Sequence, residues 1–300
     1  MKVHFRLLLL LNLVILPQLS AQEASVKLDS VIQRVQDHEG YDKEKFPLGS
    51  YSEEYYKKEA DFARQQLKEL EKVSSEGLSE TERISRELLR YQLQETVDFY
   101  DYGTYLNPLL SDSGFHVSLA YQVRDLSTYK QVRDYLNKLN ALPVYVDQHL
   151  KLLSKGIKKG NVQPIVIFEG YEATYNDQIV DDPLKSYYYS PFLDLPKTLT
   201  ASQKDSVLKA AEKAISEKVV PQFRRIKNFF ETEYLPAARE TIGVSEIPNG
   251  REYYQNRLNY YTTLNLSAEE IHEMGLKEVA RINSEMKKII KEVGFKGSFE

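Results

Sequence analysis

The 300-residue sequence contains no cysteine and no tryptophan. Without cysteine, disulfides and thiolate metal ligands are excluded. The chain must therefore be stabilised by its apolar core, and it is long enough for one large core or two small ones. Tyrosine is abundant instead, with 22 residues. Because tyrosine joins an apolar ring to a polar hydroxyl, it suits helix interfaces and cleft walls alike, and we expect most of these residues to pack between elements.

An excess of charge of one sign is also missing. The sequence has 40 Lys and Arg residues and 44 Asp and Glu residues, which gives a net charge of −4. The two signs are interspersed, so the chain has no basic footprint for nucleic acid, and we expect no nucleic-acid partner. A G-x-S-x-G elbow, a phosphate-binding glycine loop and a dinucleotide fingerprint are absent as well.

The N-terminus has the pattern of a secretory signal. A basic start is followed by an apolar run from Leu7 to Leu19 and by the small residues Ser20 and Ala21. The run is shorter than the roughly 20 residues that span a bilayer, although a retained membrane anchor is the alternative. We predict that residues 1–21 are a signal peptide. The mature protein, residues 22–300, is then exported, periplasmic or extracellular, with no membrane contact after signal cleavage.

The mature region is predicted to be all-α, because apolar residues recur at helical spacing between capping signals. Capping boxes begin at Ser79 and Ser267, each followed three residues later by glutamate. These patterns predict helices over residues 51–73, 79–102, 129–153, 200–219, 221–230 and 268–293. The last helix is predicted to end at Gly294. Its apolar residues recur every three or four positions and predict one buried face: Ile271, Gly275, Val279, Ile282, Met286, Ile289 and Val293.

Residues 164–168, Pro-Ile-Val-Ile-Phe, are the exception to this helical pattern. Their β-branched content favours a short strand. A helix is the competing prediction for the same residues. We therefore expect an all-α fold with at most a short strand pair.

Histidine offers few candidates for chemistry. His272-Glu273 begins like the H-E-x-x-H zinc motif, but Leu276 stands where the second histidine is required. We therefore expect His272 to lie on a helix face, where it bonds a neighbouring element or lines a cleft. Among the other mature histidines, His116 is the best placed for a cleft because it lies in a loop. We predict no catalytic residue and no metal ligand within this chain.

Four tyrosines near the C-terminal end are spaced to share helix faces. Tyr253 and Tyr260 lie seven residues apart, as do Tyr254 and Tyr261. We expect one pair to pack inside and the other to cover a neighbouring helix. The alternative is that one of these tyrosines presents its hydroxyl to a cleft.

Four segments follow one another in the order found in one bacterial family. They are Glu233–Arg239, Pro248–Tyr254, Tyr260–Thr263 and Glu270–Val279. Together they resemble domain-of-unknown-function family 885, whose members are secreted or lipid-anchored relatives of the helical zinc peptidases, the zincins. Members of that family are about twice as long as this chain, and their metal motif lies in the second half.

The resemblance implies that this chain is the N-terminal lobe of a two-lobed helical zincin-like protein. It would form one wall of a cleft for a peptide substrate, with the missing C-terminal half as its partner. The zinc ligands and the general-base glutamate would lie beyond residue 300. A tyrosine hydroxyl could stabilise the oxyanion that forms when metal-bound water attacks the peptide carbonyl. The cleft candidates are His272, Tyr260, Tyr261, Tyr253 and His116. The alternative function is a non-enzymatic periplasmic helical binding or scaffold protein.

Overall fold

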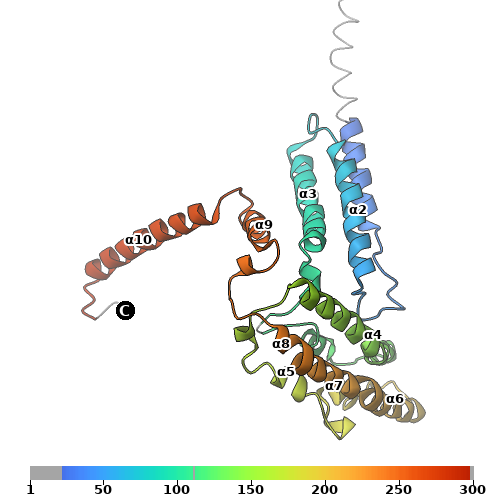
Figure 1. Ribbon diagram of the computed structural model, residues 1–300. Helices are drawn as coiled ribbons and strands as arrows, with labels where there is room; N and C mark the ends of the chain where they lie inside the picture. The colour runs from blue at the N-terminus through green and yellow to red at the C-terminus, as the bar shows by residue number, and fades with distance from the viewer. Residues whose placement is uncertain (1–21, 111, 298–300) are drawn as a thin grey trace, which may run out of the picture. The chain divides into compact units, whose positions relative to one another are not determined.

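The computed structural model describes residues 22–110 and 112–297. Within these residues the fold is helical and contains no β-strand (Figure 1). The all-α prediction is therefore confirmed. The signal peptide predicted for residues 1–21 lies outside the described residues. The chain divides into two compact units, one ending at Ile242 and the other beginning at Gly243.

The N-terminal part of the first unit is built from helical residues 22–36 and from α2 (Glu53–Glu71) and α3 (Glu80–Asp101), which pack side by side (Figure 1). The capping box predicted at Ser79 is present, and its Glu82 carboxylate accepts the Ser79 backbone N–H at 2.7 Å. The same carboxylate accepts the Ser25 hydroxyl at 2.5 Å, which ties the first helix to the start of α3. These hydrogen bonds lower the pKa of Glu82 to about 2, and the bond from Ser25 has the largest effect. Apolar residues at helical spacing fill the shared core: Leu28, Val31, Ala63, Leu70, Leu89, Leu93 and Val97.

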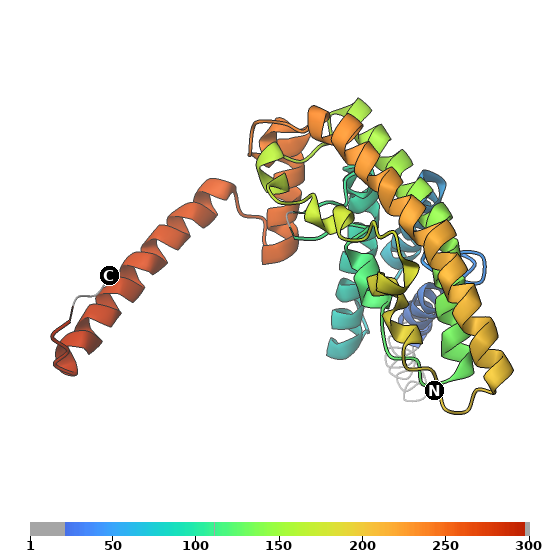
Figure 2. The ribbon, with the colours of Figure 1, turned by 90° about the horizontal axis from the view of Figure 1, so that it is seen from below.

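The rest of the first unit is built around α4 (Tyr129–Lys159), which continues through Pro143. Packed along α4 is an arm of consecutive helices (Figure 2): α6 (Ala201–Ala214), the π-helical turn η6 (Ile215–Val219), α7 (Val220–Phe229), the π-helical turn η7 (Phe230–Tyr234) and α8 (Leu235–Ala237). The helices predicted over 200–219 and 221–230 thus join without a break. Fully buried side chains such as Val146, Phe223 and Phe230 form the core between α4 and this arm.

The strand predicted for residues 164–168 is wrong. Residues Ile165–Phe168 form η3, a single 3₁₀ turn, so the competing helical prediction is closer. The Ile165 N–H donates to the Arg239 carbonyl at 2.8 Å, and this contact belongs to an isolated bridge without a ladder. Of this segment it is Phe168 that packs into the core, where its ring contacts those of Tyr171 and Tyr234, while the β-branched Ile165 and Val166 are exposed.

The second unit contains η8 (Val244–Glu246), α9 (Gly250–Thr262) and α10 (Ala268–Glu292). Gly250 begins α9 where a Cβ would lie 2.0 Å from the Val244 carbonyl oxygen, so this position requires glycine. The predicted capping box at Ser267 is present, and Gly294 has the left-handed φ of +66° expected after a helix end.

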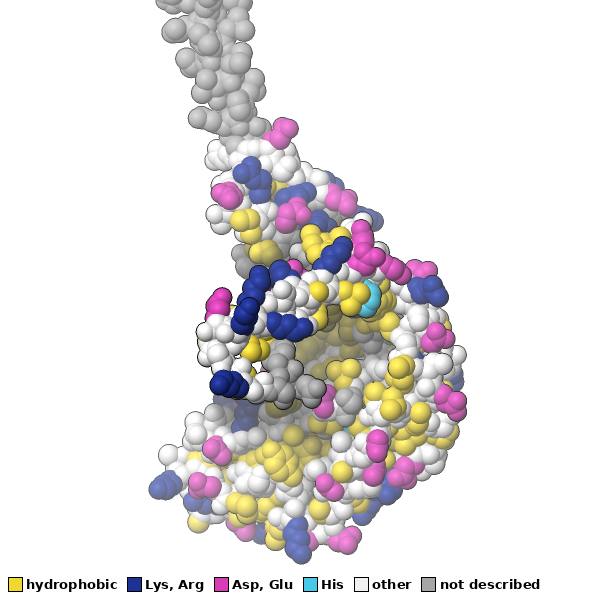
Figure 3. All heavy atoms as spheres, turned by 90° about the vertical axis from the view of Figure 1, so that its left-hand side faces the viewer, with side chains coloured by type: hydrophobic (Ala, Val, Ile, Leu, Met, Phe, Trp, Pro, Cys, Tyr) yellow, Lys and Arg dark blue, Asp and Glu magenta, His cyan; other side chains and the backbone are white. Residues whose placement is uncertain are grey.

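The apolar stripe of α10 does not have the burial that its spacing predicts. Within the described residues α10 buries no side chain, and Val279 and Ile289 are 58% and 57% exposed. Periodicity places these residues on one face of the helix but does not supply an element to cover that face. Figure 3 shows hydrophobic side chains exposed among acidic and basic ones on the face that it presents.

Candidate functional site

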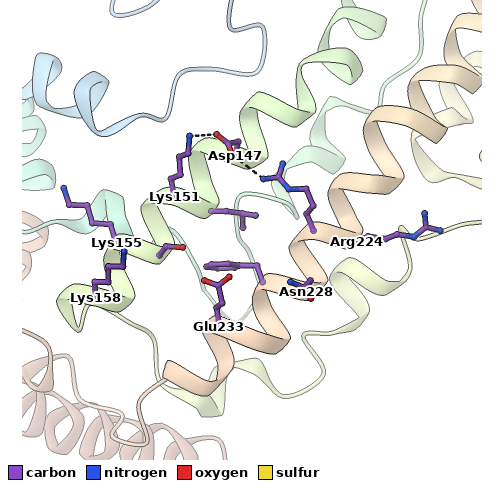
Figure 4. A pocket seen from close by; sticks show the side chains of 11 residues that line it. Asp147, Lys151, Lys155, Lys158, Arg224, Asn228 and Glu233 are labelled. Carbon is purple, nitrogen blue, oxygen red and sulfur yellow. Dashed lines mark hydrogen bonds and ion pairs between the residues drawn. The ribbon is translucent and has the colours of Figure 1, made fainter.

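A groove of about 880 Å³ opens between α4 and the α7–η7 segment of the first unit (Figure 4). On α4 its lining residues recur every three or four positions from Asp147 to Lys158, so they share one face of the helix. The opposite face of α4 carries the buried residues Val146, Leu153 and Gly156, which fix the helix to the core. The groove is therefore the solvent side of a rigid helix pair.

The floor of the groove is apolar and its rim is charged. Leu150 of α4 and Phe229 of α7 provide the apolar contacts, and Phe229 is only 4% exposed. Five cations line the groove together with two acids, Asp147 and Glu233. The cations are Lys151, Lys155, Lys158, Arg224 and Arg225. The lining thus has an excess of positive charge over an apolar surface.

Asp147 connects the two walls of the groove. Its carboxylate accepts Lys151 Nζ of the same helix at 2.8 Å and Arg225 Nη2 of α7 at 3.4 Å (Figure 4). The hydrogen bond from Lys151, followed by the charge of that lysine, lowers the pKa of Asp147 below its usual range. The two cations bound to Asp147 are therefore already partly neutralised.

The remaining cations differ in how available they are. Lys155 pairs with Glu53 of α2. Lys158 and Arg224 have no ion-pair partner among the described residues, and Arg224 extends outward from the groove in Figure 4. Lys158 and Arg224 are accordingly the cations that a ligand carboxylate can bind without displacing another acid, Lys158 at the rim and Arg224 for a ligand that extends beyond the groove.

The residues predicted as cleft candidates lie elsewhere. His116 is 1% exposed and lies in the core, where its Nε2 is 2.9 Å from Thr174 Oγ1. Tyr253 and Tyr260 of α9 share a face as predicted, because the Arg257 guanidinium lies 5.6 and 4.9 Å from their ring centroids. Tyr261 is 78% exposed. His272 is exposed on α10 of the same unit.

A second buried histidine lies close to His116. His149 of α4 stacks on the Phe115 ring with centroids 4.6 Å apart, and it also contacts Tyr51 and Tyr145. Both ring nitrogens of His149 and Nδ1 of His116 lack hydrogen-bond partners. Burial, which disfavours the charged imidazole, lowers the pKa of each histidine to about 3. Both are therefore neutral core residues at neutral pH.

The groove residues were missed because charged residues on helices normally form a solvated face. The available signal was the recurrence of lysine at positions 151, 155 and 158, beside the apolar Leu150. Within the described part of the chain, no group of three or more His, Asp or Glu side chains is arranged to hold a metal ion.

The fold and the groove define an all-helical protein with a charged groove between two packed helices. The chain belongs to the family described as "Bacterial protein of unknown function (DUF885)", whose profile matches residues 36–300. The resemblance found in the sequence is thereby confirmed.

A solved structure has the same fold. It is described as "the putative lipoprotein from Colwellia psychrerythraea", and it matches with a TM-score of 0.74 at 18% sequence identity. The match covers 94% of this chain and 51% of that one, so this chain spans about half the length of the solved relative. No curated protein gives a significant match. Among the helices of the described residues, none is long and apolar enough to cross a membrane.

Proposed function

We propose that this chain is the peptide-binding part of an exported zinc-dependent peptidase, and that the peptide binds in the α4–α7 groove. The groove carries the proposal, because an apolar floor and hydrogen-bonding side chains on two walls suit a peptide's alternation of side chains and polar backbone. Its volume of about 880 Å³ lies within the roughly 300–1,000 Å³ that is usual for ligand sites. Leu150 and Phe229 would contact an apolar side chain, while Ser154 and Asn228 can bond backbone amides.

The charge of the rim indicates which peptides bind best. Lys158 and Arg224 are unpaired among the described residues and are exposed, so a peptide carboxylate can approach them at little desolvation cost. Peptides that carry Asp, Glu or a free C-terminal carboxylate should therefore be preferred over neutral ones.

We assign cleavage to a family-length protein, which is a protein with the full length of the members of this family. Zinc hydrolysis requires ligands that leave a coordination position open for water and a base that deprotonates that water. We propose that these groups come from residues outside this chain. Export is part of the proposal, and it is supported by the signal pattern of residues 1–21 and by the description of the solved relative as a putative lipoprotein. The second candidate, a non-enzymatic binding protein, would use the same groove without the zinc step.

Fluorescence anisotropy with two short labelled peptides tests the groove. One peptide contains Asp and Glu, and the other has Asn and Gln in their place. We expect residues 22–300 to bind the acidic peptide more tightly, and the double variant Lys158→Glu/Arg224→Glu to weaken that binding about tenfold. Lys213→Glu, at an exposed position on α6 outside the groove, is the matched control and should change little. Equal binding of both peptides, unaffected by the double variant, would contradict the proposal.

The same acidic peptide separates the two candidate functions. A chelator should stop its cleavage by a family-length protein and leave its binding to residues 22–300 unchanged. Cleavage that persists without metal would contradict the zinc step. Binding without any cleavage by the family-length protein would favour the non-enzymatic alternative.

A further inference from the structure

A smaller pocket, of about 310 Å³, opens between α2 and α3. Tyr55, Tyr56 and Glu59 of α2 lie at spacings that put them on one side of their helix, and Glu95, Phe99 and Tyr100 of α3 do the same on the facing helix. Four aromatic rings and two carboxylates thus line a partly exposed pocket, and no Lys or Arg is among its lining residues.

The rings enclose the pocket at angles to one another. Tyr55 and Tyr56 have ring centroids 5.3 Å apart with planes inclined by 61°, and Tyr56 and Phe99 are 5.7 Å apart at 48°. Beneath them the Tyr105 ring contacts Tyr56 and is stacked on Tyr100. Inclined rings surround a guest with several π-faces, which carry partial negative charge.

One cation already lies over a ring of this cluster. The Arg64 guanidinium is 5.9 Å from the ring centroid of Tyr100. Ion pairs with Asp61 and Asp101 hold this guanidinium in place, and its distance from the Tyr100 ring is one at which a cation–π interaction is favourable.

The carboxylates add negative charge beside the rings. Glu59 has its two carboxylate oxygens 3.1 and 3.2 Å from Nε2 of His38, which fixes their position. Burial, followed by the negative charge of Glu59, raises the pKa of Tyr55 to about 12. The field of the carboxylate therefore reaches the aromatic wall.

We propose that the α2–α3 pocket binds an alkylammonium group. Aromatic faces with flanking carboxylates favour a cation that is large and weakly hydrated, and a volume of about 310 Å³ suits a trimethylammonium headgroup better than a whole peptide. The group can belong to a free small molecule or to a methylated lysine side chain, because the chemistry that recognises it is the same. This site is separate from the α4–α7 groove and does not depend on the proposed peptidase function.

Calorimetric titration with choline chloride tests the pocket. The comparison ligand is the neutral isostere in which carbon replaces the choline nitrogen. We expect choline to bind at least about fivefold more tightly than this isostere. Equal affinity for both ligands, or the absence of choline binding, would overturn the proposal.

Variants then locate the binding. Glu59→Gln and Glu95→Gln should each weaken choline binding about threefold, because each removes one negative charge beside the rings. Phe99→Leu should weaken it as well by removing a π-face. Glu71→Gln, at an exposed position at the end of α2 outside the pocket, is the matched control. If Phe99→Leu does not fold, the two glutamine variants decide, and unchanged binding in both would overturn the assignment.

Two peptides distinguish the source of the ammonium group. They are identical except for one position, which holds trimethyllysine in the first and norleucine in the second. Binding of the trimethyllysine peptide with an affinity near that of choline supports a peptide-borne cation. Binding of choline alone supports a small molecule.

Discussion

The α4–α7 groove and the α2–α3 pocket are both lined by side chains from two packed helices, but their charges are opposite. Five cations and two acids line the groove, whereas two acids and no cation are among the described residues that line the pocket. The net charge of the whole chain, −4, reveals neither the local excess of positive charge in the groove nor that of negative charge in the pocket. The comparison teaches that the exposed positions beside a helix–helix contact determine the charge of the groove or pocket, while the buried positions determine only the packing.

The two regions also differ in what lies beneath them. The groove lies on α4, whose buried side carries His149, whereas the pocket lies over a separate small cluster in which the buried Tyr105 contacts Tyr56 and Tyr100. The floor of the groove is part of the main core through Phe229, whereas the aromatic walls of the pocket are partly exposed. These differences in burial predict different responses to acid and to truncation.

Acid should have the largest effect, and it should act on the α4 region. His116 and His149 have pKa values of about 3 in the folded protein, below the usual 6.5. The unfolded chain therefore binds protons that the folded chain excludes. The full stability is present above pH 6.5 and is lost as the pH falls from 6.5 towards 3, by roughly 1 kcal/mol per pH unit for each histidine. Urea unfolding between pH 7 and pH 4 measures this slope.

His149→Phe sharpens this prediction. Because both ring nitrogens of His149 lack partners and its ring stacks on Phe115, phenylalanine should retain the ring contacts without burying unpaired polar atoms. The variant should be at least as stable at pH 7 and should lose less stability at low pH. A slope that is identical in His149→Phe and the parent would contradict the assignment.

Truncating one phenylalanine in each region should give the next largest effect. Phe229→Ala should lower the free energy of unfolding by about 3 kcal/mol, because it leaves a cavity in the main core. Phe99→Ala should cost about 1 kcal/mol, because its ring is partly exposed before the substitution. Chemical denaturation of both variants measures the difference. Equal losses would show that the pocket wall supports the fold as strongly as the groove floor does.

Asp147→Asn should have the smallest effect on stability. Its ion pairs are about half exposed, so their loss should cost only about 0.5 kcal/mol. Acidic peptides should nevertheless bind about threefold more tightly, because Lys151 and Arg225 are released for the ligand. Choline binding in the α2–α3 pocket should not change. Weaker binding of acidic peptides to Asp147→Asn would show that Asp147 positions the cations rather than competing for them.

Local signals predicted most of the helices, whereas contacts between distant residues decided the rest. The capping boxes at Ser79 and Ser267 depend on residues three positions apart, so the sequence alone reveals them. The 3₁₀ turn at Ile165 depends on a bond to Arg239, which no local pattern contains. The stripe of α10 was predicted correctly as a single face, but periodicity could not show that the face is exposed.

The groove could not be predicted for the same reason. Asp147 and Arg225 are separated by 78 positions in the chain, and only the packing of α4 against α7 brings them together. Each helix by itself presents an ordinary charged face. The aromatic pocket could not be predicted either. In the sequence Tyr56 and Phe99 look like ordinary packing residues, and only the structure gives the angle between their rings.

For the proposed peptide ligand, the carboxylate of Asp147 turns binding in the groove into an exchange of ions. A ligand carboxylate that takes Arg225 must displace Asp147, which then returns to water or remains on Lys151 alone. The net number of ion pairs gained is consequently smaller than the number of cations in the lining. Affinity for acidic peptides should therefore fall with salt less steeply than five cations suggest, and selectivity should depend more on the apolar side chain that reaches Phe229 than on the number of acids.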